Sequence, residues 1–564
     1  MCQKKNIKRY IVTAAFPYAN GPIHIGHLAG VYIPADIFVR YLRRKKKEVL
    51  FVCGSDEHGV PITVHAREKG ITPQEVVNKY HSMIKKNFKK FGITFDNYSR
   101  TSSKIHRKTA SDFFRSLYKR GILMEKEIEQ YYDEEAKQFL ADRYILGTCP
   151  FCMYQKAYGD QCEKCGSSLS NEELIQPKST LSGRSPVMKK TKHWYFPLEK
   201  YEKFLKKWIA KYCKNYWKSN VYGQVKSWLD DGLKPRAVTR DLEWGITVPI
   251  EGVEGKVIYV WFEAPIGYLS STMEWAKREN KNWKFYWKNK ESSLINFIGK
   301  DNIVFHCIIF PAMLKAHGGY IFTENVQANE FLNLENKKIS TSKNWAVWLH
   351  EFLEDFPKQQ DALRYILTVN MPETKDNNFS WKEFQTRFNS ELVSIVGNFV
   401  HRNMMLVHKH FQGKIPTKKK LLEKDKKILE KIKKTPKKIG FLIENYRFRE
   451  ALTFFVNLAR IGNKYLTEES PWKKGDRIES ILYISMQITG MIAQLAEPFL
   501  PFSAKKLYKL LNIKPFPWDD IENREILSYG HVLSNPEFLF KKIEDSDITK
   551  QLEKLQYKVR PGRI

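Results

Sequence analysis

Strand-like and helix-like segments alternate along the first 115 or so residues. The strand-like run YIVTA (10–14) precedes a helical pattern from about residue 28, then comes the strand-like VLFVC (49–53) and a helix start at Thr72-Pro73. Strands that alternate with helices form parallel sheets, because each helix carries the chain back across one face of the sheet. The alternation therefore predicts an α/β fold with functional loops at the carboxyl ends of its strands.

Two polar loops begin where these strands end. AAFPYANGPIHIGH covers residues 14–27 and CGSDEHG covers 53–59, so both are expected to face one crevice. Gly26 lets a flat base or the backbone approach closely, and the N-terminus of the following helix favours anions. The imidazoles of His24 and His27 can donate hydrogen bonds to phosphate oxygens. This turn is therefore a candidate site for the phosphates of a nucleotide.

The rest of the chain indicates an inserted region and a helical C-terminal part. Strand-like stretches return in GKVIYVWFEAPIGY (255–268) and SLINFIGKDNIVFHCIIFPAML (293–314), after a turn-rich middle region. From about residue 387 apolar residues recur at three- and four-residue spacing, which predicts a helix bundle with Pro436 between two of its helices. The last residues are charged and weakly periodic, which suggests a loosely held tail.

Composition favours a globular protein that binds a polyanion. Lys and Arg number 95 against 62 Asp and Glu, a formal charge of +33 over 564 residues, and 42% of residues are hydrophobic. Such a charge attracts nucleic acid, although solvated surface lysines account for about half of the excess on a plainer interpretation. No run approaches the roughly 20 apolar residues that span a bilayer, and the N-terminus lacks a signal-peptide core, so a cytoplasmic protein is expected without a membrane partner.

Four of the eight cysteines form a tight cluster. Cys149 and Cys152 make one CxxC pair, and Cys162 and Cys165 make a second pair after nine residues. Two such pairs of thiolates can surround Zn²⁺ tetrahedrally, whereas buried free thiols explain the spacing poorly. Because all four ligand positions are filled by protein, one structural zinc ion is predicted. The other cysteines are scattered, which argues against a secreted disulfide framework.

A second candidate phosphate loop is ENKKISTSKN, residues 335–344. Lys337 and Lys338 supply positive charge, and Ser340, Thr341 and Ser342 supply hydroxyl donors. This set suits a triphosphate whose leaving group must gather negative charge. Alone, a loop of this composition is usually a solvated turn.

HIGH at 24–27, KISTS at 338–342 and YVWFEAPIGY together resemble the class I aminoacyl-tRNA synthetases, specifically the methionyl-tRNA synthetase family, over about residues 8–540. The resemblance implies a Rossmann-type parallel-sheet catalytic domain, an inserted zinc-binding domain and a C-terminal helical anticodon-binding bundle. It implies that ATP and L-methionine form methionyl adenylate, with Mg²⁺ on the phosphates, and that methionine passes to initiator and elongator tRNA(Met). A monomer is expected. The boundaries implied are 1–117 and 253–328 for the two Rossmann halves, 118–252 for the inserted domain, 329–387 for the lysine loop and linking domain, 388–545 for the bundle and 546–564 for the tail.

The resemblance also assigns site residues. The family's catalytic positions match His24, His27 and Lys338, and its ATP-binding positions match these three with Gly26, Gly299, Lys300, Asp301, Ser340 and Thr341. Its methionine-binding positions match Tyr18, Asp56, Trp261, Ala264, Pro265, Tyr268 and His306. An aromatic pocket suits a thioether and a carboxylate suits the substrate ammonium. Its anticodon-binding positions match Asn398, Arg402 and Trp472, side chains that can stack on bases and bond to their edges.

One position departs from the family pattern, and other functions remain open. The family loop has a second lysine where this chain has Thr341, so Lys343 or Lys337 is expected to supply that charge. Synthetases for isoleucine, valine or leucine need an editing insertion, because one methylene is worth only roughly 1–3 kcal/mol, and the middle region is too short for it. A catalytically dead zinc- and RNA-binding module is the alternative of another class. Methionine-dependent ATP–pyrophosphate exchange would distinguish it from an enzyme.

Overall fold

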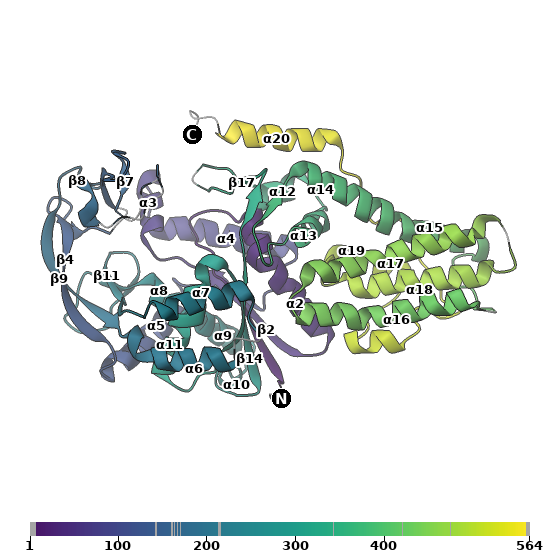
Figure 1. Cartoon of the computed structure of the whole chain (residues 1–564), viewed down its shortest axis with the longest axis horizontal. Coiled ribbons are helices and arrows are strands. Elements are labelled where there is room, and N and C mark those ends of the chain that lie inside the picture. Colours follow the sequence, from purple (N-terminus) through teal and green to yellow (C-terminus); the bar gives the residue numbers. More distant parts are fainter. Residues whose placement is uncertain are drawn as a thin grey trace.

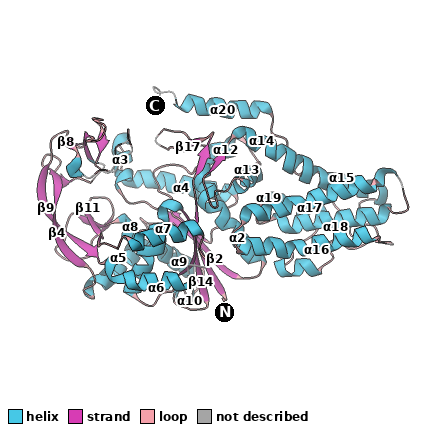
Figure 2. Cartoon of the chain, viewed as in Figure 1, coloured by secondary structure: helices cyan, strands magenta, loops and turns pink. Residues whose placement is uncertain are grey.

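The computed structural model (Figure 1) describes residues 7–141, 144–159, 162, 164–165, 167, 169, 171–212, 216–341, 343–419, 421–473 and 475–559. A parallel sheet occupies the centre of the molecule. A strand-rich part lies on one side of it and an all-helical part on the other (Figure 2). Among the residues that the structure describes, no helix combines the length and the apolar character needed to cross a membrane.

The central sheet has five parallel strands in the order β15-β14-β1-β2-β3. Ile11 of β1 pairs with Leu294 of β14 on one side and with Leu50 of β2 on the other. Almost every residue of β14 is buried, as expected for parallel strands covered on both faces. Two separate parts of the chain therefore build one sheet, which confirms the predicted insertion. The strands are β1 Arg9–Ala14, β2 Glu48–Ser55, β3 Asn97–Arg100, β14 Ser292–Gly299 and β15 Thr323–Asn329.

The helices associated with this sheet follow its strands along the chain. A three-residue helix at the HIGH turn runs through the π-helix Leu28–Tyr32 into α2, a continuous helical path away from the sheet edge. The capping box of Thr72 and Glu75 begins α4 where the sequence predicts a helix. These helices are α1 Ile25–His27, α2 Ile33–Arg44, α3 Val60–Lys69, α4 Pro73–Phe91, α5 Lys104–Lys119, α8 Val260–Glu263, α9 Ile266–Arg278, α10 Lys284–Trp287 and α11 Phe310–His317.

Two of the strand predictions were wrong over much of their length. In 255–268 only β13, Lys256–Ile258, is a strand, and the chain then forms α8 and the start of α9. In 293–314 strand β14 ends at Gly299, and the π-helix Phe305–Ile309 and α11 follow. These helices are buried on most sides, so they lack the polar stripe that distinguishes a helix from a buried strand.

The inserted region is built from short antiparallel strands. Its largest sheet has the order β10-β9-β4-β5, and a three-stranded sheet, β7-β6-β8, carries the cysteine cluster. A third sheet, β11-β13-β12, leads back to the Rossmann part. The elements are β4 Met124–Asp133, β5 Gln138–Phe139, β6 Ile145–Thr148, β7 Ala157–Tyr158, β8 Ile175–Ser179, β9 Val187–Phe196, α6 Glu202–Tyr212, α7 Ser219–Asp230, β10 Arg236–Ala237, β11 Thr239–Asp241 and β12 Ile246–Thr247.

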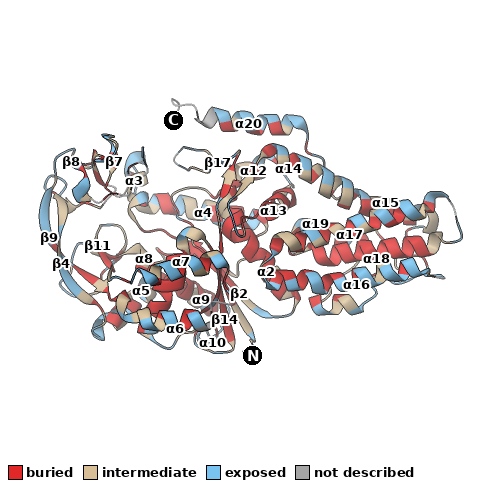
Figure 3. Cartoon of the chain, viewed as in Figure 1, coloured by how far each residue is buried: buried red, intermediate tan, exposed pale blue. Residues whose placement is uncertain are grey.

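The C-terminal part is helical, as predicted, and α18 is its core. Every residue of α18 from 480 to 496 is buried, and Figure 3 shows this helix as an almost unbroken buried ribbon among its neighbours. The linking region before the bundle holds a small sheet, β17-β16-β18. The elements are β16 Leu332–Leu334, β17 Lys337–Lys338, α12 Leu349–Asp355, α13 Gln360–Val369, β18 Asn377–Phe379, α14 Trp381–Arg387, the π-helix Phe388–Gly397, α15 Asn398–Phe411, α16 Glu423–Glu444, α17 Phe448–Glu469, α18 Ile478–Ala496, α19 Pro501–Leu511 and α20 Asp545–Val559.

Two helix predictions in this part were wrong. Helix α16 continues through Pro436, whose carbonyl accepts a hydrogen bond from Trp518 Nε1 at 3.1 Å. Burial of Ile432 and Ile439 on either side offsets the hydrogen bond that proline removes. The expected loose tail instead forms α20, where Leu555 is buried and Lys554 Nζ lies 2.9 Å from Asp355 of α12. Residues 560–564 of that predicted tail lie outside the described residues.

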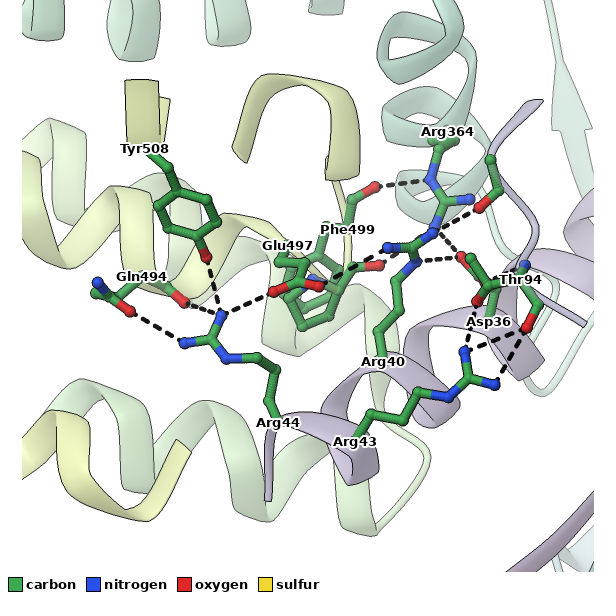
Figure 4. Close-up of polar contacts among 12 residues, drawn as sticks. Asp36, Arg40, Arg43, Arg44, Thr94, Arg364, Gln494, Glu497, Phe499 and Tyr508 are labelled. Carbon is green, nitrogen blue, oxygen red and sulfur yellow. Dashed lines mark hydrogen bonds and ion pairs between the residues drawn. The ribbon is translucent and has the colours of Figure 1, made fainter. Parts of the chain in front are cut away.

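Ion pairs join α2 of the catalytic part to the linking region and to the bundle. Asp36 of α2 accepts hydrogen bonds from Arg40 at 2.7 Å and from Arg364 of α13 at 2.8 Å. Arg44, at the end of α2, reaches Glu497 at 2.9 Å (Figure 4). Asp36 and Arg364 are fully buried, and removing one partner of such a pair leaves an uncompensated charge. Helix α2 therefore connects the HIGH turn to the helical part through fixed contacts.

Candidate functional site

The two imidazoles of the HIGH turn are fixed by the backbone of α1. His24 Nδ1 accepts hydrogen bonds from the backbone N–H of Gly26 at 3.1 Å and of His27 at 3.4 Å. His27 Nδ1 accepts from the backbone N–H of His24 at 3.3 Å, and the two rings stack with centroids 3.6 Å apart. Because each Nδ1 is an acceptor, each neutral ring carries its proton on Nε2. Neither Nε2–H has a hydrogen-bond partner in the part of the chain that the structure describes, so both can donate to a ligand.

Burial keeps these rings neutral near pH 7. It lowers the pKa of His27 to about 4. Burial, with the neighbouring His27, holds the pKa of His24 well below its ordinary range. At neutral pH the turn therefore offers hydrogen-bond donors and the positive end of the helix dipole, rather than two full charges.

The lysine loop lies directly on this turn. A β-carbon added to Gly26 would lie 3.2 Å from Ile339 Cδ1 and 3.0 Å from the His24 ring, so a larger residue at position 26 would press against both side chains. Backbone hydrogen bonds join Ile25 N to Val347 O at 3.1 Å and Leu349 N to Ile23 O at 2.8 Å. The structure therefore brings the two predicted phosphate loops, more than 300 residues apart in the sequence, into contact.

Tryptophans give the lysine loop a closed shape. Ser340 and Trp345 exchange two backbone hydrogen bonds of 3.0 and 2.9 Å, which close the turn that carries Thr341. Trp345 Nε1 donates to Leu334 O at 3.2 Å, and Trp348 Nε1 donates to the side chain of Asn344 at 2.8 Å. Thr341 is exposed, and Ser342 lies outside the described residues.

The lysines around this loop differ in their surroundings. Lys300 Nζ lies 4.1 Å and Lys338 Nζ 5.9 Å from the centroid of the Phe331 ring, so these two predicted residues share one neighbour. Lys300 is also held by Glu330 at 2.7 Å and Asp376 at 3.0 Å. Lys337 instead lies over Trp345, 5.3 Å from the ring centroid.

Gly299 and Asp301 form a tight turn at the carboxyl end of β14. A β-carbon on Gly299 would lie 2.5 Å from Asp301 Oδ1, a distance that no real side chain tolerates. Asp301 Oδ2 accepts a hydrogen bond from Asn302 Nδ2 at 3.1 Å. A side chain at position 299 would therefore displace the Asp301 carboxylate from its present position.

Asp56 is a buried carboxylate with an unused oxygen. The backbone of Asp56 pairs with the segment around Tyr18, through Ala19 N to Asp56 O at 2.8 Å and Asp56 N to Pro17 O at 2.9 Å. Its side chain is 6% exposed, and Oδ1 has no hydrogen-bond partner among the described residues. Burial, together with the nearby Glu263, holds the pKa of Asp56 well above its usual range. A cation bound at Oδ1 would relieve this penalty.

Helices α8 and α9, with the two residues between them, carry four of the predicted pocket residues. Tyr268 is buried, and its hydroxyl lies 2.8 Å from His306 Nε2, while His306 Nδ1 lies 3.0 Å from the carbonyl of Asn302. Since a carbonyl only accepts, Nδ1 carries the proton and Nε2 accepts from the tyrosine. Burial lowers the pKa of His306 to about 4. Trp261 is half-buried with Nε1 bonded to Ala237 O at 2.9 Å. Ala264 is half-buried and Pro265 is buried.

A buried His–Glu–His cluster near Asp56 was missed by sequence reasoning. Glu263 Oε1 lies 2.8 Å from His58 Nδ1, and Oε2 lies 2.5 Å from His106 Nε2. His106 Nδ1 lies 2.9 Å from Ser270 Oγ. Although burial opposes it, the charges of His58 and His106 lower the pKa of Glu263. His58 and Glu263 belong to the motifs CGSDEHG and YVWFEAPIGY, but no pattern signalled His106.

The four cysteine thiols meet at one point. Their sulfur atoms all lie within 4.8 Å of one another, with Cys149 Sγ 3.8 Å from Cys165 Sγ and Cys152 Sγ 3.5 Å from Cys162 Sγ. A tetrahedron with Zn–S bonds of about 2.3 Å has edges of about 3.8 Å, so the cluster fits one zinc ion. The backbone N–H groups of Cys149 and Cys162 each donate a hydrogen bond of 2.9 Å to a backbone carbonyl. These two bonds shape the two turns.

The predicted anticodon residues also lie together. The guanidinium of Arg402 lies 4.5 Å from the centroid of the Trp472 ring, which is 45% exposed. Asn398 is exposed one helical turn before Arg402 on α15. We call these three residues the anticodon surface.

A cavity of about 610 Å³ lies beside the Asp56 pocket rather than in it. It is bounded by α3, by the β4–β5 hairpin and by residues 241–244 of the inserted region. Its lining begins at Gly59, three residues after Asp56. Sequence reasoning did not predict it.

Comparison with known proteins gives consistent matches along the chain. The family model described as tRNA synthetases class I (M) matches residues 10–404, and the anticodon binding domain of methionyl tRNA ligase matches residues 415–558. The methionine–tRNA ligase of Flavobacterium johnsoniae is 57% identical, covering 98% of this chain and 82% of the relative. That of Bacteroides fragilis is 58% identical, covering 99% of this chain and 84% of the relative.

Solved structures agree on the fold. The Mycobacterium tuberculosis methionyl-tRNA synthetase in complex with methionyl-adenylate superposes with a TM-score of 0.78 at 22% identity, over 95% of this chain and 100% of that one. The first family model spans more than half of the chain, and the two relatives are more than half identical to it. The chain therefore belongs to the methionine–tRNA ligases, a family of class I aminoacyl-tRNA synthetases.

Proposed function

We propose that this chain joins L-methionine to tRNA(Met) in two steps at the crevice between the HIGH turn and the lysine loop. The observation that supports the proposal is the close approach of Ile339 to Gly26, because the two loops proposed to bind phosphate then lie side by side at one edge of the parallel sheet. The carboxyl ends of β1, β2 and β14 carry the HIGH turn, Asp56 and Gly299. This is where ligands bind in open α/β sheets.

In the first step the methionine carboxylate attacks the α-phosphate of ATP in line, and pyrophosphate leaves. That carboxylate has a pKa of roughly 3.5 and is ionised at pH 7, so no general base is needed. We assign the Nε2–H groups of His24 and His27, and the ammonium of Lys338, to the phosphate oxygens as their charge develops. Such donors act by electrostatic stabilisation and positioning. Gly26, Gly299, Lys300, Asp301, Ser340 and Thr341 complete the proposed ATP site, and Mg²⁺ would arrive with the phosphates.

The methionine pocket is assigned around Asp56. Its unpartnered Oδ1 suits the substrate ammonium, and the ion pair would compensate both buried charges. Tyr18, Trp261, Ala264, Pro265, Tyr268 and His306 are assigned to the side chain, where aromatic faces suit a polarizable thioether. His306 would present a fixed tautomer, because Tyr268 and the carbonyl of Asn302 hold its two nitrogens.

In the second step the ribose hydroxyl of the terminal adenosine attacks the carbonyl of methionyl adenylate, and AMP leaves. The anticodon surface would select the tRNA, with bases stacking on Trp472 and Arg402 and bonding to Asn398. Both initiator and elongator tRNA(Met) are proposed as substrates.

The lysine missing at Thr341 is assigned to Lys343. Neighbours in a strand point to opposite faces, so Lys337 points away from Lys338 and lies over Trp345 instead. Lys343 follows the exposed turn, where its backbone N–H lies 3.4 Å from Ser340 Oγ.

The four cysteines would hold one structural Zn²⁺, which would cross-link the two CxxC pairs. It would have no catalytic role, because protein fills all four ligand positions. We propose the sequence-derived boundaries 118–252 for this inserted domain and 388–545 for the bundle. A reducing cytoplasm suits the free thiols, and we propose a monomer there. Metal analysis tests the zinc: one ion per chain is expected, falling in Cys152→Ser, and a metal-free purified protein would contradict the assignment.

Methionine-dependent ATP–pyrophosphate exchange is the direct test of the reaction. We expect exchange with methionine and at least tenfold weaker exchange with leucine, isoleucine or valine, since a pocket separates such side chains by roughly 10- to 200-fold. Exchange with none of a panel of amino acids would favour the binding-module alternative. Faster exchange with another amino acid than with methionine would show that the chain is not specific for methionine.

A further inference from the structure

Phe538 is an exposed ring on a firmly held segment. The ring is 70% exposed, whereas the backbone carbonyl of Phe538 accepts a hydrogen bond from Lys506 Nζ of α19 at 2.7 Å. Two residues later, Phe540 packs edge-on against Phe388 with centroids 5.8 Å apart. Ile543 N donates to the side chain of Asn389 at 3.0 Å. The fold therefore presents this ring to solvent on a segment that is anchored on both sides.

The Phe538 ring is backed by an imidazole of α15. The rings of Phe538 and His401 stack with centroids 4.1 Å apart and planes 15° apart. His401 lies three residues after Asn398 and directly before Arg402. Residues three and four positions apart are neighbours on a helix surface, so His401 and Arg402 both adjoin Asn398. The Phe538–His401 stack and the Arg402–Trp472 stack therefore flank Asn398 on two sides.

This arrangement extends the anticodon surface to a second aromatic group. Trp472 is 45% exposed and Met405, one turn further along α15 beyond His401 and Arg402, is 50% exposed. Both stacks lie in or next to the part of the chain that matches an anticodon-binding domain, and Phe538 lies inside it. Splayed single-stranded bases are bound by stacking on exposed aromatic faces of this kind.

We propose that Phe538, supported by His401, is a stacking platform for an unpaired base of the anticodon loop, distinct from the platform on Trp472. The proposal rests on the proposed function of the anticodon surface. A nucleobase is the occupant because the exposed groups are separate flat faces around a polar Asn398, rather than the continuous apolar patch of a protein interface. Lys541 and Lys542 lie three and four residues after Phe538 and are exposed, which suits the loop phosphates.

The test is equilibrium binding of tRNA(Met) to the full chain and its variants. Phe538→Ala should raise Kd by about 5- to 100-fold, the range of one base–aromatic stack, and Phe538→Tyr should stay within about threefold of the parent because it keeps the ring. His401→Ala should fall between them, since it removes only the support of the ring. The matched control is Tyr529→Ala, which removes a ring 73% exposed in the same matched domain.

A tRNA series with 2-aminopurine at each anticodon-loop position locates the base. Stacking quenches this fluorophore, so Phe538→Ala should brighten one position and Trp472→Ala a different one. The salt dependence of Kd should keep its slope in Phe538→Ala, because the ring neutralises no phosphate.

Several results would overturn the platform. These are a Phe538→Ala affinity equal to that of Tyr529→Ala, a Phe538→Tyr as weak as the alanine variant, or brightening of the same position by both alanine variants. A lowered melting temperature in Phe538→Ala would also count against it, because the loss would then be structural. If Trp472→Ala binds as tightly as the parent, the anticodon surface itself fails, which is a separate outcome.

Discussion

At Asp56 the carboxylate that would bind the substrate ammonium is buried before any ligand arrives, whereas the ring of Trp472 on the anticodon surface stands in solvent. Asp56 is 6% exposed and has one oxygen without a hydrogen-bond partner among the described residues, while Trp472 is 45% exposed and stacks on Arg402. A small charged substrate needs a desolvated partner, because the ion pair is strong only where water is excluded. A base carries its own apolar face, so an exposed ring is sufficient.

The Asp56 pocket and the anticodon surface differ in their effect on the stability of the folded protein. A buried carboxylate without a partner destabilises the folded protein, whereas an exposed ring has little effect on it. Removing the Asp56 carboxylate should therefore lower activity without lowering the free energy of unfolding. Ordinary core substitutions, by contrast, lower the free energy of unfolding. Substitutions on the anticodon surface should change tRNA binding alone.

The largest effect is expected for Asp56→Ala. Removing one partner of a buried ion pair should lower kcat/KM for methionine in the exchange reaction by roughly 100- to 1000-fold. The melting temperature should stay level or rise, because the unpartnered carboxylate is gone. Asp56→Asn is the isosteric control and should also lose methionine binding. Unchanged exchange kinetics would remove Asp56 from the site and end the contrast.

Trp472→Ala should act on the other region only. Aminoacylation of tRNA(Met) should fall by about 5- to 100-fold in kcat/KM through the loss of one base stack, with exchange and melting temperature nearly unchanged. Parallel assays of exchange and charging measure this split. An equal fall in both steps would show that the anticodon assignment is wrong.

The free energy of unfolding should depend on pH through the buried histidine of the proposed methionine pocket. His306 has a folded pKa of about 4, against roughly 6.5 when unfolded. Between these values the unfolded state binds the extra proton, so stability falls as pH falls. At pH 5 His306 alone should take about 2 kcal/mol from the unfolding free energy relative to pH 7.5. Urea unfolding of His306→Gln should show a correspondingly shallower decline, and an identical decline would contradict the linkage.

The smallest effect is expected for the lysine that replaces Thr341. Lys343→Ala should lower kcat of exchange by roughly tenfold, less than an enclosed oxyanion donor because the residue is exposed. Lys337→Ala should change it less, since that side chain lies over Trp345. Adding Thr341→Lys to Lys343→Ala should restore the rate. A larger loss in Lys337→Ala would reverse the assignment.

The parts of the fold predicted well are those where a local pattern and a family motif coincide. The strand-to-helix turn at His24 and the four cysteines were placed correctly, because each depends on a few neighbouring residues. The contact of Gly26 with Ile339 followed only from the resemblance, since nothing in either segment specifies the other.

The failures have physical causes. Tyr268 lies in a helix that is buried on most sides, so its apolar run was indistinguishable from a strand. A proline ends most helices in which it falls, but at Pro436 tertiary packing outweighs this local preference and α16 continues. His106 bonds to Glu263, which lies 157 residues further along the chain. No pattern in a single sequence indicates such a pairing.

Arg44 makes the catalytic part and the bundle hard to separate. Its guanidinium lies 2.9 Å from Glu497 and 3.2 Å from the carbonyl of Gln494, both in the bundle, so a cut between the linking region and the bundle would leave this nearly buried cation without these partners. Neither fragment should then fold well when expressed alone. Exchanging the bundle for that of a relative should succeed only when the incoming bundle supplies an acidic side chain at the position of Glu497, which makes this pair a test of compatibility for chimeras.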